Sequence, residues 1–127
     1  MRKIVIMGAL VALLVGVFAS AAYARTFTCT DLPCNGTNNP DVINERPAAG
    51  TPDEIHGLRG ADYINAGISF DDVDVVYGGK GGDTISTDDY DDLDTIYAGM
   101  GTDTCYVDAG DAYFGCEVVY IDGVLQP

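Results

Sequence analysis

Aspartate recurs along this chain at regular intervals, each time two positions before an apolar residue or a cysteine. The gaps between successive members are 12, 9, 12, 9, 11 and 9 residues, so two gaps together span 20 or 21 residues. The aspartates therefore alternate between two sides of a repeating unit. They form a first side, with Asp41, Asp62, Asp83 and Asp103, and a second side, with Asp53, Asp74 and Asp94. Carboxylates that recur in this way are suited to hard cations, which prefer oxygen ligands.

The chain also aligns with itself at an offset of 20 residues. Residues 70–86 and 90–106 share eight identical positions, and a weaker copy occupies residues 57–65. A period this short cannot hold a pair of helices and is typical of a solenoid in which each coil stacks on the last. We therefore expect an all-β fold, built from short strands that carry alternating side chains.

Glycine-rich turns precede three of the first-side aspartates. Glycine permits positive φ, which lets backbone carbonyls turn towards one point, where the following aspartate adds a carboxylate. Calcium takes six to eight such oxygens in flexible geometry, whereas magnesium demands a rigid octahedron, so calcium is the expected ion. The candidate ligand residues are Gly57, Arg59, Gly60 and Asp62 in one turn, Gly78, Gly79, Lys80, Gly81 and Asp83 in the next, and Gly99, Met100, Gly101 and Asp103 in the third.

The turns of the second side differ, because Asp71-Asp72-Val73-Asp74 and Asp91-Asp92-Leu93-Asp94 contain no glycine. Several carboxylates converge in each turn, which makes Asp72, Asp74, Asp92 and Asp94 further candidate calcium ligands. The alternative is an acidic edge surrounded by water. The sequence leaves the choice between the two open.

The first-side turns resemble the Gly-Gly-x-Gly-x-Asp-x-apolar-x nonapeptide of RTX, or hemolysin-type, calcium-binding repeats. Residues 78–86 match at every specified position, whereas the earlier copy departs at Leu58 and the later one at Ala98. In its aspartate and strand pattern the resemblance spans residues 41–106. It implies a right-handed parallel β-roll or β-helix of about four short coils. Calcium would be held between successive turns by aspartate carboxylates and turn carbonyls.

The expected core of this solenoid is thin. Ile43, Ile64, Ile85 and Cys105 should stack along one wall, and they should face Ile55, Val76 and Ile96 on the other. So few apolar side chains cannot offset the conformational entropy of the ordered backbone. We therefore expect calcium binding to be coupled to folding.

Residues 1–24 have the features of a secretory signal peptide: a basic start, an apolar run and the cleavage pattern Ala22-Tyr23-Ala24. Cleavage would change the formal net charge from −14 to −16. A protein this acidic repels nucleic acid and attracts cations. From the signal peptide we expect the mature protein to be secreted and free of the membrane. Residues 25–40 are expected to form an N-terminal cap, residues 41–106 the repeats, and residues 107–127 a C-terminal cap.

Four cysteines in a small secreted domain favour two disulfides. The short-range pairing, Cys29–Cys34 and Cys105–Cys116, is the predicted one. Metal binding by these cysteines is a weaker alternative, because neither pair has the Cys-x-x-Cys spacing.

No catalytic constellation stands out in the sequence. His56 has no Ser or Cys beside it in a nucleophile pattern, and no His-Glu-x-x-His motif occurs. The predicted function is that of a secreted, non-enzymatic calcium-binding module. The alternatives are a calcium-dependent enzyme acting on polysaccharide, of the lyase or epimerase-like β-helix kind, and a surface adhesion module.

Overall fold

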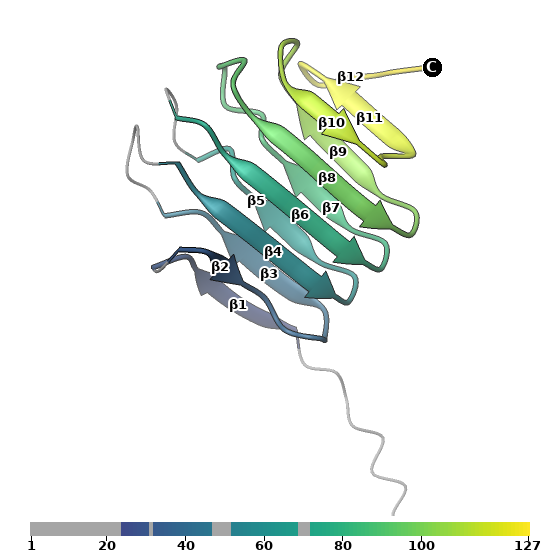
Figure 1. Ribbon diagram of the computed structural model, residues 1–127. Helices are drawn as coiled ribbons and strands as arrows, with labels where there is room; N and C mark the ends of the chain where they lie inside the picture. The colour runs from purple at the N-terminus through teal and green to yellow at the C-terminus, as the bar shows by residue number, and fades with distance from the viewer. Residues whose placement is uncertain (1–23, 31, 47–51, 69–71) are drawn as a thin grey trace, which may run out of the picture.

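The structure is a computed structural model that describes residues 24–30, 32–46, 52–68 and 72–127 (Figure 1). The predicted signal peptide lies outside the described residues, except for Ala24. Within the described ranges, no helix is long and apolar enough to cross a membrane.

The chain winds between two sheets and forms a stack of coils, so the predicted all-β solenoid is confirmed (Figure 1). Every strand pair is parallel except β11 with β12, which is antiparallel. The seven-stranded sheet contains, in spatial order, β1 (Arg25–Thr28), β3 (Asp41–Asn44), β5 (Tyr63–Asn65), β7 (Thr84–Ser86), β9 (Thr104–Val107), β11 (Val118–Ile121) and β12 (Val124–Leu125). The five-stranded sheet contains β10 (Ala112–Phe114), β8 (Thr95–Met100), β6 (Val75–Lys80), β4 (Glu54–Arg59) and β2 (Cys34–Asn35).

The core is the predicted double file of apolar residues. Ile43 is paired with Ile64, Ile64 with Ile85, and Ile85 with Cys105 in the seven-stranded sheet. On the facing wall, Val76 is paired with both Ile55 and Ile96. All these residues are buried, and small side chains such as Ala66 and Ala98 fill the space beside them. The core is narrow, as the sequence predicted, with one file of larger apolar side chains on each wall.

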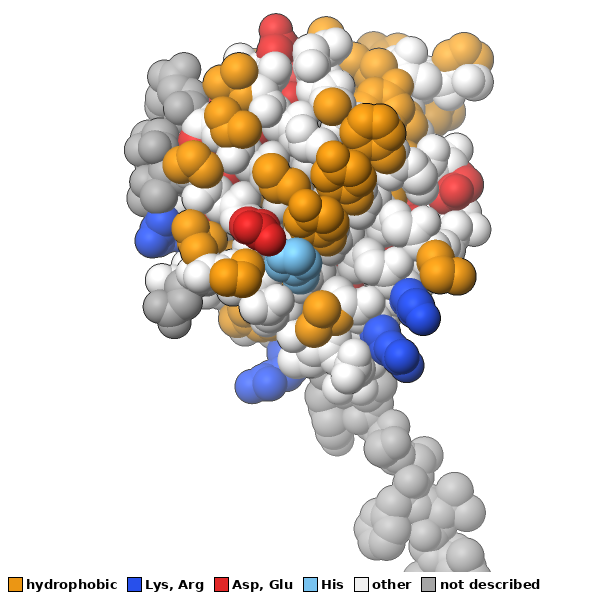
Figure 2. Space-filling model, viewed as in Figure 1, with side chains coloured by type: hydrophobic (Ala, Val, Ile, Leu, Met, Phe, Trp, Pro, Cys, Tyr) orange, Lys and Arg blue, Asp and Glu red, His pale blue; other side chains and the backbone are white. Residues whose placement is uncertain are grey.

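A file of aromatic rings runs across the outer face of the five-stranded sheet. His56, Tyr77, Tyr97 and Phe114 stack nearly parallel, with ring centroids 4.6 to 5.2 Å apart. Figure 2 shows this file as a row of orange side chains that ends at the pale-blue histidine. These rings follow from the register, which places residues of one kind above each other in successive coils.

Both ends of the stack carry a disulfide. Cys29 is bonded to Cys34 and Cys105 to Cys116, so the predicted pairing is confirmed. The ranges expected to act as caps, residues 25–40 and 107–127, contain the terminal strands of both sheets.

Candidate metal centres

The first-side aspartates form a continuous buried ladder along the solenoid. In each coil one carboxylate oxygen accepts a hydrogen bond from the backbone N–H of the aspartate in the preceding coil. Asp62 Oδ1 accepts from Asp41, Asp83 Oδ1 from Asp62, and Asp103 Oδ1 from Asp83, at 2.7 to 2.9 Å. Glu117 Oε2 accepts from the Asp103 N–H at 2.8 Å and continues the ladder. The sequence pattern did not include Glu117, because no Gly-x-Gly-x-Asp turn precedes it.

The other carboxylate oxygen of these aspartates is buried without a hydrogen-bond partner, as is seen for Asp62, Asp83 and Asp103. The surroundings of Gly57 and Gly78 show what this oxygen faces. A Cβ added at Gly57 would lie 2.7 Å from Asp62 Oδ2 and against the carbonyl oxygen of Gly78. At Gly78 it would lie 2.7 Å from Asp83 Oδ2 and against the carbonyl oxygen of Ala98. At each of these glycines, a carboxylate oxygen of the same coil and a carbonyl oxygen of the next coil therefore lie close to one point, an arrangement that suits a hard cation.

The glycines of these turns are required by close backbone contact. Gly81 and Gly101 have φ values of 141° and 147°, and a Cβ at Gly81 would collide with the carbonyl oxygen of Gly60. Leu58, which departs from the repeat pattern, still adopts a positive φ of 76°. The coil therefore keeps the same backbone path where the sequence departs from the pattern.

Three of the predicted first-side residues, Arg59, Lys80 and Met100, have exposed side chains. These residues contribute to the turns through their backbone groups. The carbonyl of Lys80 accepts from the Gly60 N–H and that of Met100 from the Gly81 N–H, at 2.9 and 2.8 Å.

Burial works against the charge of the first-side carboxylates. It raises the pKa of Asp62 to about 6, with further increases from the charges of Asp83 and Asp41. Burial also raises the pKa of Asp83 and that of Asp103, and the neighbouring carboxylates Asp103 and Glu117, respectively, add to the effect. A bound cation would favour the charged forms.

The second side repeats the same ladder. Asp74 Oδ1 accepts from the Asp53 N–H at 2.7 Å, Asp94 Oδ1 from the Asp74 N–H at 2.7 Å, and Asp111 Oδ1 from the Asp94 N–H at 3.1 Å. The second oxygens of Asp74 and Asp94 are buried without a hydrogen-bond partner. Asp74 and Asp94 do not lie on a water-exposed acidic edge, because they are only 0 % and 2 % exposed.

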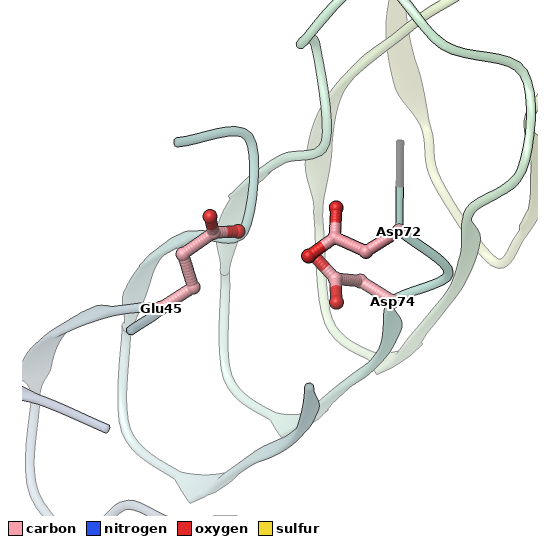
Figure 3. A group of neighbouring side chains, drawn as sticks. All are labelled: Glu45, Asp72 and Asp74. Carbon is pink, nitrogen blue, oxygen red and sulfur yellow. The ribbon is translucent and has the colours of Figure 1, made fainter. Parts of the chain in front are cut away.

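Here the carboxylates gather in groups of three whose ligand atoms lie within 4.8 Å of one another. The groups are Glu45, Asp72 and Asp74 (Figure 3); Asp72, Asp89 and Asp91; and Asp91, Asp94 and Asp111. The sequence predicted Asp72, Asp74 and Asp94 but missed Glu45, Asp89, Asp91 and Asp111. For Asp89 and Asp91, the repeated aspartates in residues 88–94 were a signal in the sequence that could have indicated them.

Asp92 stands apart from these groups. It is exposed, and its Oδ1 accepts from the Gly110 N–H at 3.2 Å. Asp72 aligns with Asp92 at an offset of 20 residues but is only 4 % exposed. The connection between β7 and β8 is one residue shorter than that between β5 and β6. Asp72 and Asp92 therefore take different positions in their connections although they align in the sequence.

Burial raises the pKa values of two second-side aspartates further than that of Asp62. Burial, followed by the charges of Asp72 and Glu45, raises the pKa of Asp74 to about 9. Burial, followed by the charge of Asp111 and others, raises the pKa of Asp94 to about 8. Asp53, at the N-terminal end of the ladder, has a basic neighbour: Arg46 Nη2 lies 3.8 Å from its Oδ1.

The repeats match a sequence model of the RTX calcium-binding nonapeptide repeat, which represents four copies. The matched segments are residues 50–85, 67–93 and 77–113, which together cover half of the chain. Comparison with curated proteins and with solved structures finds no match.

Proposed function

Because the chain belongs to the RTX calcium-binding nonapeptide repeat family, we propose that it is a secreted, non-enzymatic calcium-binding module. Calcium is held between successive first-side turns, and its binding is coupled to folding. The residues that would hold it are the first-side aspartates, together with the carbonyls of the glycine turns.

One observation carries the assignment to the first side. The Oδ2 atoms of Asp62 and Asp83 are buried and lack a donor, and each lies beside the same turn glycine as a carbonyl oxygen of the next coil. An unpartnered buried acceptor costs free energy. A calcium ion bound by these oxygens supplies the missing positive charge with the ligand type that it prefers.

Coupling to folding follows from the same atoms. The narrow core contributes little apolar stabilisation. The coils also bury a row of carboxylates of like charge, which destabilises the folded chain. An ion that binds only the folded chain adds about 2.7 kcal/mol when its free concentration is a hundredfold above its dissociation constant. Several such ions would decide whether the chain is folded.

Secretion is supported by the two disulfides, which form and persist in oxidising compartments. The apolar run near the N-terminus supports it independently.

Calorimetric titration with calcium tests the first-side assignment. Asp83 lies between Asp62 and Asp103 in the ladder, so Asp83→Ala should remove about two bound ions. Asp92→Ala is the matched control, since Asp92 is exposed and lies outside the carboxylate groups of the described residues. It should leave the stoichiometry unchanged. Unchanged binding in Asp83→Ala would show that the first side does not hold the ions.

Far-UV circular dichroism tests the coupling separately. The wild-type chain in excess chelator should be largely disordered and should gain β structure as millimolar calcium is added. A well-ordered β spectrum in chelator would contradict the coupling but not the binding.

A further inference from the structure

The outer face of the five-stranded sheet carries three neighbouring rows of residues, which the register of β4, β6 and β8 sets side by side. The first row is the aromatic file, the second lies two residues further along each strand, and the third is formed by the last residue of each strand. The rows are His56, Tyr77, Tyr97 and Phe114; Leu58, Gly79 and Gly99; and Arg59, Lys80 and Met100.

The third row places two positive charges next to each other. Arg59 and Lys80 are paired in the register of β4 and β6, and both side chains are exposed. Like charges at paired positions of a sheet destabilise it. Neither residue forms an ion pair with a carboxylate of the described residues, whereas Arg46 lies beside Asp53. In a chain with 20 acidic and six basic residues, this placement disfavours the fold and indicates an anionic ligand from outside.

The middle row leaves a strip of bare backbone between the rings and the cations. A Cβ at Gly79 would collide with Leu58 O, and one at Gly99 would collide with Gly79 O, so the neighbouring backbone requires glycine there. Figure 2 looks onto this face and shows mostly white surface between the row of rings and two neighbouring blue side chains. A ligand on this strip would have the rings along one edge and the positive charges along the other.

The same groups recur from coil to coil, which favours a ligand that also repeats. The ring centroids follow each other at 4.6 to 5.2 Å along the file. Because the rings stack face to face, their edges are what the surface offers, and the phenol groups of Tyr77 and Tyr97 can donate and accept hydrogen bonds. Solenoids use such extended faces to bind long partners.

We propose that this face binds a linear anionic polysaccharide. Arg59 and Lys80 donate to its carboxylate or sulfate oxygens, and the phenol groups form hydrogen bonds with its hydroxyl groups. Nucleic acid fits less well, because its closely spaced phosphates are repelled by the acidic remainder of the chain. The side chains concerned are exposed, and Lys80 contributes to the glycine turns through its carbonyl, so the inference goes beyond the proposed function.

Calorimetric titration with soluble hyaluronan and with chondroitin sulfate, in millimolar calcium, tests the role of the charges. Arg59→Gln and Lys80→Gln should each weaken binding on the order of tenfold, and added salt should weaken wild-type binding. Arg25→Gln is the matched control, because it removes the same charge from an exposed side chain in β1 of the other sheet. It should bind like the wild type.

A second pair of variants tests the aromatic row without changing the charge. Tyr97→Phe removes the hydroxyl group and keeps the ring between Tyr77 and Phe114, so the stack is preserved. It should weaken binding of the same polysaccharides about fivefold. Tyr106→Phe is the matched control, because Tyr106 stacks on Tyr120 in the seven-stranded sheet. It should leave the affinity unchanged.

A folded wild-type chain that binds neither polysaccharide, or that binds neutral dextran equally well, would overturn the proposal. Equal weakening by Arg25→Gln would reduce the effect to net charge and would overturn it too. Tighter binding of single-stranded DNA would assign the face to nucleic acid instead. Calcium titration separates this inference from the proposed function: Arg59→Gln and Lys80→Gln should keep the full number of ions. A chain that binds calcium but no polysaccharide would refute the inference alone.

Discussion

The two sides of the solenoid share one hydrogen-bond ladder but surround it with different chemistry. On each side, the backbone N–H of an aspartate donates to the carboxylate of the next coil, and the second carboxylate oxygen is left unpartnered. On the first side, a backbone carbonyl oxygen of the next coil lies beside the same turn glycine as that oxygen, and a carbonyl is a neutral dipole. On the second side its neighbours are other carboxylates, each carrying a full charge when ionised. The same backbone device therefore gives two kinds of oxygen-rich site.

The pKa values of three buried aspartates also differ between the two sides. Mainly through burial, the pKa of Asp62 on the first side rises to about 6, whereas those of Asp94 and Asp74 on the second side rise to about 8 and about 9. Beside Asp53 the chain supplies its own positive charge, because Arg46 Nη2 lies 3.8 Å from Asp53 Oδ1.

The largest expected effect tests the dependence of the first side on backbone geometry. In Gly81→Ala the new Cβ would collide with the carbonyl oxygen of Gly60, and the φ of 141° disfavours any side chain. Chemical denaturation in saturating calcium should show a loss of several kcal/mol or no folded state at all. Gly82→Ala is the matched control, because Gly82 has no positive φ and its nearest contact would be Thr102 O at 3.1 Å. Equal losses in the two variants would show that the turn geometry is not what limits the first side.

The sequence was sufficient to predict the fold because the same pattern of residues recurs in it several times. A strand with an inward apolar residue recurs at 20 or 21 residues, so the stacking of Ile43, Ile64 and Ile85 could be derived without coordinates. The disulfides followed from the short spacing of the cysteines. The turn glycines could be placed because positive φ is a local property of the chain.

The second-side groups could not be predicted in the same way. They form from residues of different coils and depend on how connections of unequal length place each side chain. Asp72 and Asp92 are identical in the self-alignment, yet one is buried and the other exposed. Glu45 breaks the repeat at a position where later coils have Ala66, Thr87 and Val107. A single residue that departs from a repeat carries no periodic signal, so its role appears only when neighbouring coils are assembled.

A smaller effect should separate the two sides by pH in the calcium-stripped chain. An aspartate in an unfolded chain has a pKa of about 3.9, below the raised values of Asp62, Asp94 and Asp74. Between the unfolded and folded pKa values the folded chain binds more protons. Its extra stability is therefore complete below about pH 4 and is lost as the pH rises through the folded values. The contribution of Asp62 should be lost near pH 6, and those of Asp94 and Asp74 near pH 8 to 9.

Circular dichroism of the stripped chain across this range provides the measurement. β structure should be present in acid and decline as the pH rises. Asp94→Asn should preserve it to higher pH, whereas Asp62→Asn should change only the lower part of the curve. β structure that increases with pH in the stripped wild-type chain would contradict this account of both sides.

The smallest expected effect concerns Leu58, the residue at which the first side departs from its own pattern. Leu58 pairs with Gly79 in the adjacent coil and has a φ of 76°, a conformation that costs a residue with a Cβ about 1 kcal/mol. Its side chain is 42 % exposed, so its removal sacrifices little buried area. At an ordinary strand position, alanine is more stable than glycine. Here the order should reverse, and Leu58→Gly should be more stable than Leu58→Ala by about 1 kcal/mol in urea denaturation with saturating calcium. Because both variants remove the same leucine contacts, the difference between them isolates the backbone. An alanine variant as stable as the glycine variant would mean that the first side tolerates side chains at its positive-φ positions, and the contrast with the second side would then rest on the carbonyls alone.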